Sequence, residues 1–319
     1  MRGLVAGNWF RQINFEALQQ SQTDKTLADQ FSFAGYRNWV EPSVLRAQPE
    51  RYHLYVSYAC PFAHRVILMR ALLGLEKVIS MSVADPYLGG EQGWWFQTPT
   101  QASDYDGVTP DELYSASYLH TIYTKADAAY TGRVTVPVLW DKQAETIVSN
   151  DSAAIMRMLN RAFGSRPSGT DLYPDSSRSA IDEMNRFIVE NINLGVYRVG
   201  TADSQTAYES AVGELFEALH HVDSWLKKQP FLVGEQITES DCLLFTTGIR
   251  FDVAYYPVLY TSLKRWSDFP NLSAHLQRML AVEAISATVK LDHYRKHYFD
   301  DDAFINRRRL PNGHFIIPL

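Results

Sequence analysis

The hydrophobic pattern of the sequence changes at residues 164–177, a segment that contains Pro167, Gly169 and Pro174. Before this segment, short runs rich in β-branched and aromatic residues alternate with stretches of helical period, whereas almost every stretch after it has helical period. A length of 319 residues suits two packed domains of ~150 residues each. The sequence therefore predicts a mixed α/β domain followed by an all-α domain.

The α/β domain is expected at residues 51–165, behind an N-terminal arm at 1–50 that lies on the main body. The expected anchors of this arm are Phe31, Phe33, Trp39 and Val40. The predicted elements of the domain are a strand at 52–57, a helix at 63–73, a strand at 78–83, a loop-rich insertion at 85–114, a helix at 115–130, strands at 134–140 and 145–149, and a helix at 151–163. This order is typical of a thioredoxin-like fold.

The all-α domain is expected at residues 175–300, followed by a C-terminal tail at 301–319. Thr238 and Asp241 have the spacing of a helix capping box, with Asp in the usual place of Glu or Gln. The predicted helices of this domain are 179–194, 205–228, 239–254, 272–282 and 284–297.

Composition excludes several classes of protein. The formal charge of −6 lacks the basic excess of a nucleic-acid binder. No apolar run approaches the ~20 residues of a membrane-spanning helix, and the start of the chain does not look like a secretion signal. Two cysteines are too few for a disulfide scaffold. We therefore expect a cytoplasmic protein without nucleic-acid or membrane partners; His293 and His297 share a helix face, but no metal is expected there.

Cys60 lies where the first predicted strand runs into the first predicted helix, and Pro61 follows it. Proline is favoured at the first position of a helix, so Cys60 is expected at or next to the N-cap. Unpaired N–H groups and the helix dipole lower thiol pKa values from ~8.5 to ~3.5–7.5 at such positions. The position predicts a nucleophile. The alternative, a buried and inert cysteine, is the interpretation we give to Cys242 in its apolar run.

The sequence Cys-Pro-Phe-Ala at 60–63 lacks the second thiol of a Cys-x-x-Cys motif. A mixed disulfide on Cys60 then needs an external thiol, which points to glutathione as cosubstrate. In a thioredoxin-like domain the Val136-Pro137 bond is expected to be cis, with the Val136 backbone beside the thiol. Asp151 and Ser152 open a helix and suit the γ-glutamyl group of glutathione. The alternatives are a proline that ends an edge strand and simple N-capping.

These motifs resemble those of the glutathionyl-hydroquinone reductases, the Xi-class, omega-like branch of the glutathione transferases. The resemblance covers about residues 30–310. It implies a glutathione transferase fold, in which a thioredoxin-like domain precedes an all-helical domain, and a homodimer built through the helical domain. It is carried in order by residues 58–65 (YACPFAHR), 93–94 (GW), 132–142 (GRVTVPVLWDK), 148–152 (VSNDS), 193–197 (NLGVY), 250–252 (RFD) and 297–299 (HYF).

The resemblance also implies roles for individual residues. Cys60 matches the nucleophile, and Tyr197 and Tyr298 match residues that face the hydroquinone. The family commonly has Trp in place of Phe62 and Glu in place of Asp151, which bears on glutathione affinity more than on the chemistry. The residues implied to bind glutathione are Trp94, Arg133, Val136, Asp151 and Ser152.

In the expected reaction, the Cys60 thiolate takes the glutathionyl group from a glutathionyl-hydroquinone and tyrosine hydroxyls stabilise the enolate that leaves. A second glutathione then releases oxidised glutathione from the mixed disulfide. Two alternatives stay open at this point. One is a broader omega-like activity on dehydroascorbate or on glutathionylated proteins, and the other is a non-catalytic binding module with a transferase fold. The sequence does not identify the natural hydroquinone.

Overall fold

The computed structural model describes residues 2–13, 35–88, 90–163 and 171–300. The chain forms two compact units, residues 1–169 and 170–319. The predicted arm anchors Phe31 and Phe33 and the predicted tail lie outside the described residues. Trp39 is wrong as a buried anchor, since 41% of it is exposed. Within the described parts of the arm, Leu4 and Leu45 are fully buried.

The first unit combines short strands with helices, in the order predicted for its main part. Its strands are β1 (Gly3–Val5), β2 (Asn8–Phe10), β3 (Tyr52–Val56), β4 (Ser80–Val83), β5 (Gly132–Arg133), β6 (Val138–Asp141) and β7 (Thr146–Ser149). Its helices are α3 (Pro42–Ala47), a 3₁₀ turn at Pro49–Arg51, α4 (Pro61–Leu72), α5 (Leu119–Ala126) and α6 (Ser152–Phe163).

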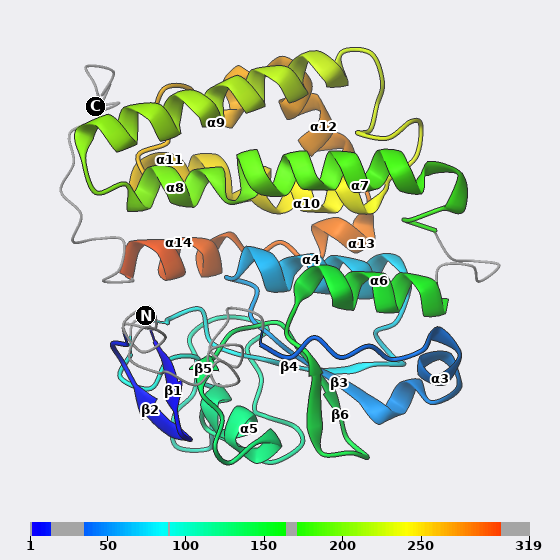
Figure 1. Cartoon of the computed structure of the whole chain (residues 1–319), viewed down its shortest axis with the longest axis vertical. Coiled ribbons are helices and arrows are strands. Elements are labelled where there is room, and N and C mark those ends of the chain that lie inside the picture. The colour runs from blue at the N-terminus through cyan, green and yellow to red at the C-terminus, as the bar shows by residue number, and fades with distance from the viewer. Residues whose placement is uncertain (1, 14–34, 89, 164–170, 301–319) are drawn as a thin grey trace, which may run out of the picture. The chain divides into compact units, whose positions relative to one another are not determined.

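A four-stranded mixed sheet is the framework of the first unit. Its strand order is β4-β3-β6-β7; β3 is parallel to β4 and antiparallel to β6, and β6 and β7 form an antiparallel hairpin. Figure 1 shows α4 and α6 together on one side of this sheet and α5 on the other. All five residues of β3 are buried, as expected of a strand covered on both faces. The predicted thioredoxin-like fold is confirmed.

Helix α4 begins two residues before and ends one residue before the helix predicted at 63–73. Cys60 is the N-cap, with an extended backbone, and Pro61 is the first helical residue, where its missing N–H costs no hydrogen bond. Gly74 follows the helix with φ +63°, the left-handed conformation that commonly ends a helix at glycine. The first turn of α4 therefore stands directly after the central strand β3.

The prediction was wrong in two places in the first unit. The strand expected at 134–140 begins only at Val138, because Pro137 has no N–H to give to a sheet. The helix expected at 115–130 is confined to α5, and Ser115, with φ +55°, lies outside helical conformation. Between β4 and α5 the described residues form no other helix or named strand, in agreement with the predicted insertion.

The second unit is entirely helical over its described residues, as predicted. Its helices are α7 (Arg178–Phe187), α8 (Gly195–Thr201), α9 (Gln205–Leu226), α10 (Glu239–Arg250), α11 (Tyr256–Val258), α12 (Pro270–Leu280), α13 (Glu283–Ser286) and α14 (Leu291–Asp300). Two π-helical turns, Ile188–Asn193 and Phe251–Tyr255, continue α7 and α10, and 3₁₀ turns occupy Asp175–Ser177 and Trp266–Asp268. None of the described helices combines the length and the apolar character needed to cross a bilayer.

Two helices of the second unit differ from their predictions. The helix predicted at 284–297 is wrong, because α13 and α14 are separate and the buried Thr288 hydroxyl donates to the Ile285 carbonyl between them. Helix α8 was not predicted, since Gly195 and Gly200 disfavour a helix in isolation. Gly200 packs closely on Leu259: a Cβ at this position would lie 2.6 Å from the leucine side chain.

Helix α10 is the core of the second unit. It contacts α7, α12 and both π-helical turns, and all of its residues except Ile249 are buried. The predicted capping box is confirmed at its start, where Asp241 accepts hydrogen bonds from the Thr238 N–H and hydroxyl. The same carboxylate accepts from the Leu232 N–H and lies 2.9 Å from His275 Nε2. One buried carboxylate thus joins α10, α12 and the loop before α10.

Replacing Asp241 with alanine should lower the free energy of unfolding by ~3–5 kcal/mol, since several buried donors would lose their acceptor. Urea unfolding followed by circular dichroism measures the change. Glu217→Ala, at an exposed position on α9, is the control and should stay within ~0.5 kcal/mol of the parent. Equal stabilities of the two variants would contradict the role given to Asp241.

Candidate functional site

Cys60 provides a thiol at the N-terminus of α4, with its side chain partly accessible. Its Sγ lies 3.6 Å from the carbonyl oxygen of Val136, to which the thiol donates. The Val136-Pro137 peptide bond is cis, as the sequence analysis expected. The structure therefore brings together Cys60 and Val136, which are 76 residues apart in the chain.

Arg133 is a charged residue that interacts with this thiol. It lies on β5 and its side chain reaches solvent. Desolvation lowers the pKa of its guanidinium, and the charge of Cys60 acts in the opposite direction. This coupling shows that a thiolate at Cys60 and the Arg133 guanidinium would attract each other.

Asp151 and Ser152 stand at the start of α6, the second helix on this face of the sheet. Asp151 Oδ1 accepts a hydrogen bond from the Ala154 N–H, so the capping that the sequence suggested is present. The other carboxylate oxygen of Asp151 lies 3.8 Å from Arg37 Nε. Ser152 accepts a hydrogen bond of 3.3 Å from Arg65 Nη1. An anion placed here would meet helix N–H groups and a hydroxyl.

Trp94 is in the insertion between β4 and α5 and is 5% exposed. Its carbonyl accepts from the Leu119 N–H at the start of α5. Gly93, just before it, has φ +73° and lies against the ring of Trp9, where a Cβ would come within 2.7 Å of the indole. The backbone before Trp94 is therefore fixed, and the side chain of Trp94 is almost fully buried.

Three tyrosines form a hydroxyl cluster in the second unit. The hydroxyl of Tyr298, on α14, lies 2.6 Å from that of Tyr197 and 3.2 Å from that of Tyr255. The rings of Tyr255 and Tyr298 pack edge to face, with centroids 5.0 Å apart. Tyr255 and Tyr298 are fully buried, whereas Tyr197, on α8, is only half-buried. Tyr197 is thus the member of the cluster most open to a ligand.

The π-helical turns set the directions of two members of this cluster. One turn, Ile188–Asn193, precedes α8, and the other ends at Tyr255. Asn193 fixes the first turn on α10 by donating to the Leu243 carbonyl and to the Thr247 hydroxyl. An inserted residue rotates everything after it around the helix axis, and such turns are frequent at functional sites.

Tyr298 keeps its proton over a wide pH range. Burial raises its pKa well above the usual value, the neighbouring Tyr197 and Tyr255 raise it further, and Arg250 opposes the shift. At neutral pH all three groups are hydroxyls that both donate and accept hydrogen bonds. The cluster is suited to stabilise negative charge that develops on an oxygen atom.

Sequence reasoning missed Tyr255 and Arg65. The matching segment at 250–252 stops just before Tyr255, and helical periodicity cannot place a residue inside a π-helical turn. The sequence leaves two interpretations open for His64, one turn after Cys60: it could assist the thiolate or, with Arg65, lie on the helix surface. The second is wrong, since both residues are buried. The Arg65 guanidinium lies 4.6 Å from the centre of the Phe62 ring, so a signal was present in their spacing of three residues on one helix.

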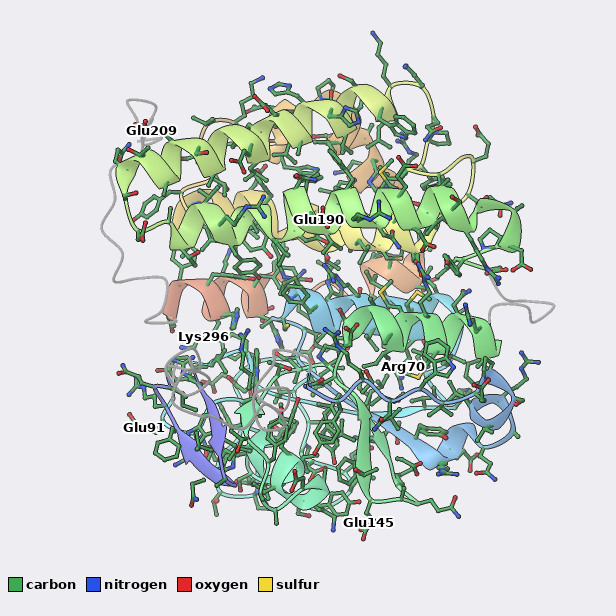
Figure 2. The ribbon with its side chains drawn as sticks, viewed as in Figure 1. Arg70, Glu91, Glu145, Glu190, Glu209 and Lys296 are labelled. Carbon is green, nitrogen blue, oxygen red and sulfur yellow. The ribbon has the colours of Figure 1, made fainter. Side chains whose placement is uncertain are left out.

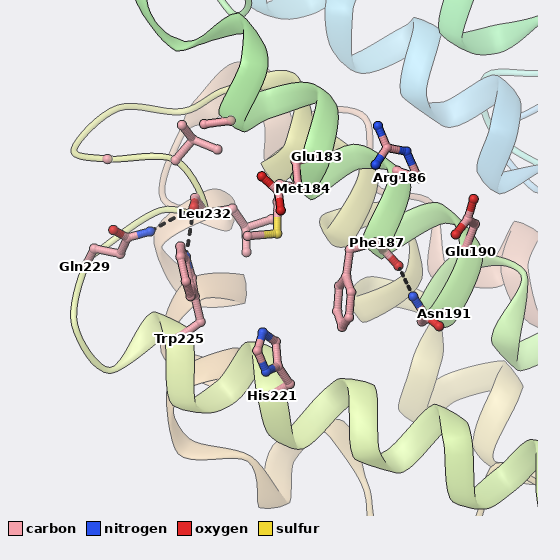
Figure 3. Close-up of a pocket in the computed structure, with 13 residues that line it drawn as sticks. Glu183, Met184, Arg186, Phe187, Glu190, Asn191, His221, Trp225, Gln229 and Leu232 are labelled. Atoms are coloured by element: carbon pink, nitrogen blue, oxygen red, sulfur yellow. Dashed lines mark hydrogen bonds between the residues drawn. The ribbon is translucent and has the colours of Figure 1, made fainter.

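A pocket of about 500 Å³ lies elsewhere in the second unit (Figure 3). It is formed by α7 with its π-helical turn, by α9 and by residues 229–234, and Phe187, His221 and Trp225 supply its aromatic side chains. None of the residues singled out from the sequence lines it. No group of three or more His, Cys, Asp or Glu side chains placed to hold a metal ion occurs within the described ranges.

Comparisons with known proteins identify the fold and the family of the chain. Family models described as glutathione S-transferase, N-terminal domain and C-terminal domain, match residues 59–162 and 205–278. Glutathionyl-hydroquinone reductase PcpF from Sphingobium chlorophenolicum is 43% identical over 277 residues, which are 86% of this chain and 84% of that protein. The structure of a Xi class GST from Natrialba magadii gives a TM-score of 0.83 at 40% identity, covering 95% of this chain and 91% of that one. The glutathione-bound structure of YqjG from Escherichia coli K-12 gives 0.75 at 45% identity, covering 79% and 80% of the two chains.

The two thiols should differ strongly in reactivity. Cys242 is fully buried in α10, and burial raises its pKa well above the usual value, whereas Cys60 is accessible at a helix N-terminus. Iodoacetamide under native conditions should therefore modify one thiol, at Cys60, and two thiols after unfolding. Peptide mapping by mass spectrometry identifies the site. Cys60→Ser should give no native modification; comparable labelling of Cys242 would contradict the assignment.

Proposed function

Because the chain belongs to the Xi-class glutathione transferases, the family of the glutathionyl-hydroquinone reductases, we propose that it reduces glutathionyl-hydroquinones to hydroquinones with glutathione as the reductant. The observation that carries the proposal is the thiol of Cys60 at the N-cap of α4, beside the Val136 carbonyl. The other thiol of the chain, Cys242, is buried. A disulfide formed on Cys60 is therefore resolved by a thiol from solution.

Glutathione recognition under this proposal uses the first unit. The glutathione backbone pairs with Val136, and its γ-glutamyl carboxylate meets the N-terminus of α6 and the Ser152 hydroxyl. The ammonium group lies on Asp151, while Trp94 and Arg133 contribute contact area and positive charge. This assignment is supported by YqjG, whose structure contains glutathione and is 45% identical to this chain over the region that it matches.

The chemical step splits a carbon–sulfur bond. The Cys60 thiolate attacks the sulfur of the glutathionyl-hydroquinone, and a ring carbon must leave, which is difficult for an aryl carbanion. If the ring first tautomerises to a ketone, the departing group is an enolate with its charge on oxygen. Hydroxyls of Tyr197 and Tyr298, held together at 2.6 Å, stabilise that oxygen. Tyr255 supports them by its own hydrogen bond to Tyr298.

The second step regenerates the enzyme. The enolate takes up a proton and leaves as hydroquinone, and Cys60 is left in a disulfide with glutathione. A second glutathione thiolate attacks the glutathionyl sulfur of this disulfide, releasing oxidised glutathione and the Cys60 thiolate. Two electrons pass from glutathione to the ring carbon. The kinetics expected are of the ping-pong type.

We further infer a homodimer in the cytoplasm. The reaction consumes reduced glutathione and needs Cys60 as a free thiol, conditions that a reducing compartment provides. The second unit exposes large apolar side chains, among them Leu194 and Trp225, each 41% exposed. Apolar surface of this kind is common at interfaces between subunits. Light scattering after gel filtration that gives the mass of a single chain would contradict the dimer.

Substitutions should separate the two chemical roles. Cys60→Ala and Cys60→Ser are expected to abolish release of hydroquinone and oxidised glutathione, because the nucleophile is lost. Tyr298→Phe should lower kcat by ~10²–10³-fold, the usual effect of removing one donor to a developing oxyanion. The assay follows a glutathionylated hydroquinone with excess glutathione by stopped-time chromatography of both products.

Tyr256→Phe is the matched control for the tyrosines. Tyr256 follows Tyr255 in the chain, but it packs against Arg265, outside the hydroxyl cluster. Its variant should retain the parent kcat within about twofold. Wild-type inactivity on the conjugate together with turnover of dehydroascorbate would favour the broader omega-like activity. Full activity in Cys60→Ala would contradict the covalent mechanism itself.

A further inference from the structure

The N-terminal arm pairs with the segment that leads into α6. Asn38 N–H donates to the Val148 carbonyl, and Arg37 forms an antiparallel bridge with Ser149. Tyr36 exchanges two hydrogen bonds of 3.0 Å with Asn150: its N–H donates to the Asn150 side chain and its carbonyl accepts from the Asn150 N–H. Residues 36–38 therefore hold the backbone immediately before Asp151.

The Tyr36 ring connects the arm to a second part of the proposed glutathione site. It stacks on Tyr130, with centroids 5.6 Å apart, and contacts Tyr123 edge to face. The hydroxyl of Tyr130 donates to the Arg133 carbonyl, and the hydroxyl of Tyr123 donates to the Thr135 carbonyl. These two bonds fix the backbone on the approach to Val136.

Asn150 links the segment before Asp151 to the segment before Val136. Its side-chain amide donates to the Tyr123 hydroxyl at 2.9 Å and lies 3.5 Å from the Thr135 hydroxyl. A single network thus runs from Tyr36 to the segment before Val136 and to the residue before Asp151. The Tyr36 hydroxyl itself is buried and has no hydrogen-bond partner within the described ranges, so the ring and the backbone of Tyr36 make these contacts.

The β1–β2 hairpin of the same arm holds a third part of the site. Strand β1 pairs with β5, which places Gly3 opposite Arg133. Trp9 Nε1 donates to the Glu91 carbonyl at 2.8 Å, and its ring lies against Gly93, the residue before Trp94. Figure 2 shows the labelled Glu91 beside this hairpin.

We propose that the described parts of the N-terminal arm, the β1–β2 hairpin and residues 36–38, position the glutathione site and that Tyr36 is the principal positioning residue. This inference rests on the proposed function, which assigns glutathione to this site. The arm contacts the segments that carry Trp94, Arg133 and Asp151. It reaches the segment before Val136 through Tyr123, whose ring contacts Tyr36 and whose hydroxyl donates to the Thr135 carbonyl. Binding groups on separate loops act together only when a surrounding layer of contacts fixes them.

Calorimetric titration of glutathione into Cys60→Ser, which forms no mixed disulfide, tests the proposal. Adding Tyr36→Ala should raise the Kd for glutathione by about tenfold, since loss of the stack frees two loops at once. Tyr36→Phe should restore the Kd to within about twofold, because the ring and backbone contacts remain. Trp39→Ala removes an exposed aromatic from the same arm and should also leave the Kd within about twofold.

The outcomes distinguish this inference from the proposed function. A Cys60→Ser parent that binds no glutathione overturns the glutathione site and the inference with it. A parent that binds, with Tyr36→Ala equal to it in Kd and lower only in melting temperature, overturns the role of the arm alone. If Tyr36→Ala does not fold, Tyr36→Leu, which fills the space without a ring, takes its place and should show the same weaker binding.

Discussion

The junction between β3 and α4 is the constraint on which the candidate site depends. Strand β3 is buried along its whole length between β4 and β6. The position of the residues that follow β3 is therefore fixed by the sheet. Pro61 starts the helix there, and Cys60 becomes its N-cap. The thiol then lies beside the carbonyl of Val136, which comes just before the start of β6 at the same edge of the sheet. The positions of the Cys60 thiol and of the Val136 backbone are thus both consequences of the same sheet.

The second unit supplies a different kind of chemistry by departing from regular helices. Two π-helical turns break the 3.6-residue period next to Tyr197 and at Tyr255, and α14 brings Tyr298 to the same point. Burial keeps the Tyr298 hydroxyl protonated, because desolvation raises its pKa. A reaction that needs charge on a leaving oxygen is served by hydroxyls that stay neutral.

Local sequence signals predicted most of the fold and part of the site. Cys60 with Pro61, and Thr238 with Asp241, are adjacent or closely spaced residues whose chemistry is visible without a structure. The grouping of three hydroxyls was not visible, since it depends on π-helical turns and on helices far apart in the chain. The role of the arm was also hidden, because Tyr36 acts through contacts with residues about 90–115 positions away.

The central claim is that Cys60 carries the glutathionyl group between two half-reactions. Mixing the protein with one equivalent of a glutathionyl-hydroquinone, in the absence of free glutathione, tests it directly by intact-mass and peptide mass spectrometry. The account predicts one glutathionyl group on Cys60 and one equivalent of released hydroquinone; added glutathione then converts the mixed disulfide to the free Cys60 thiol and oxidised glutathione. Hydroquinone released while Cys60 stays unmodified would contradict it.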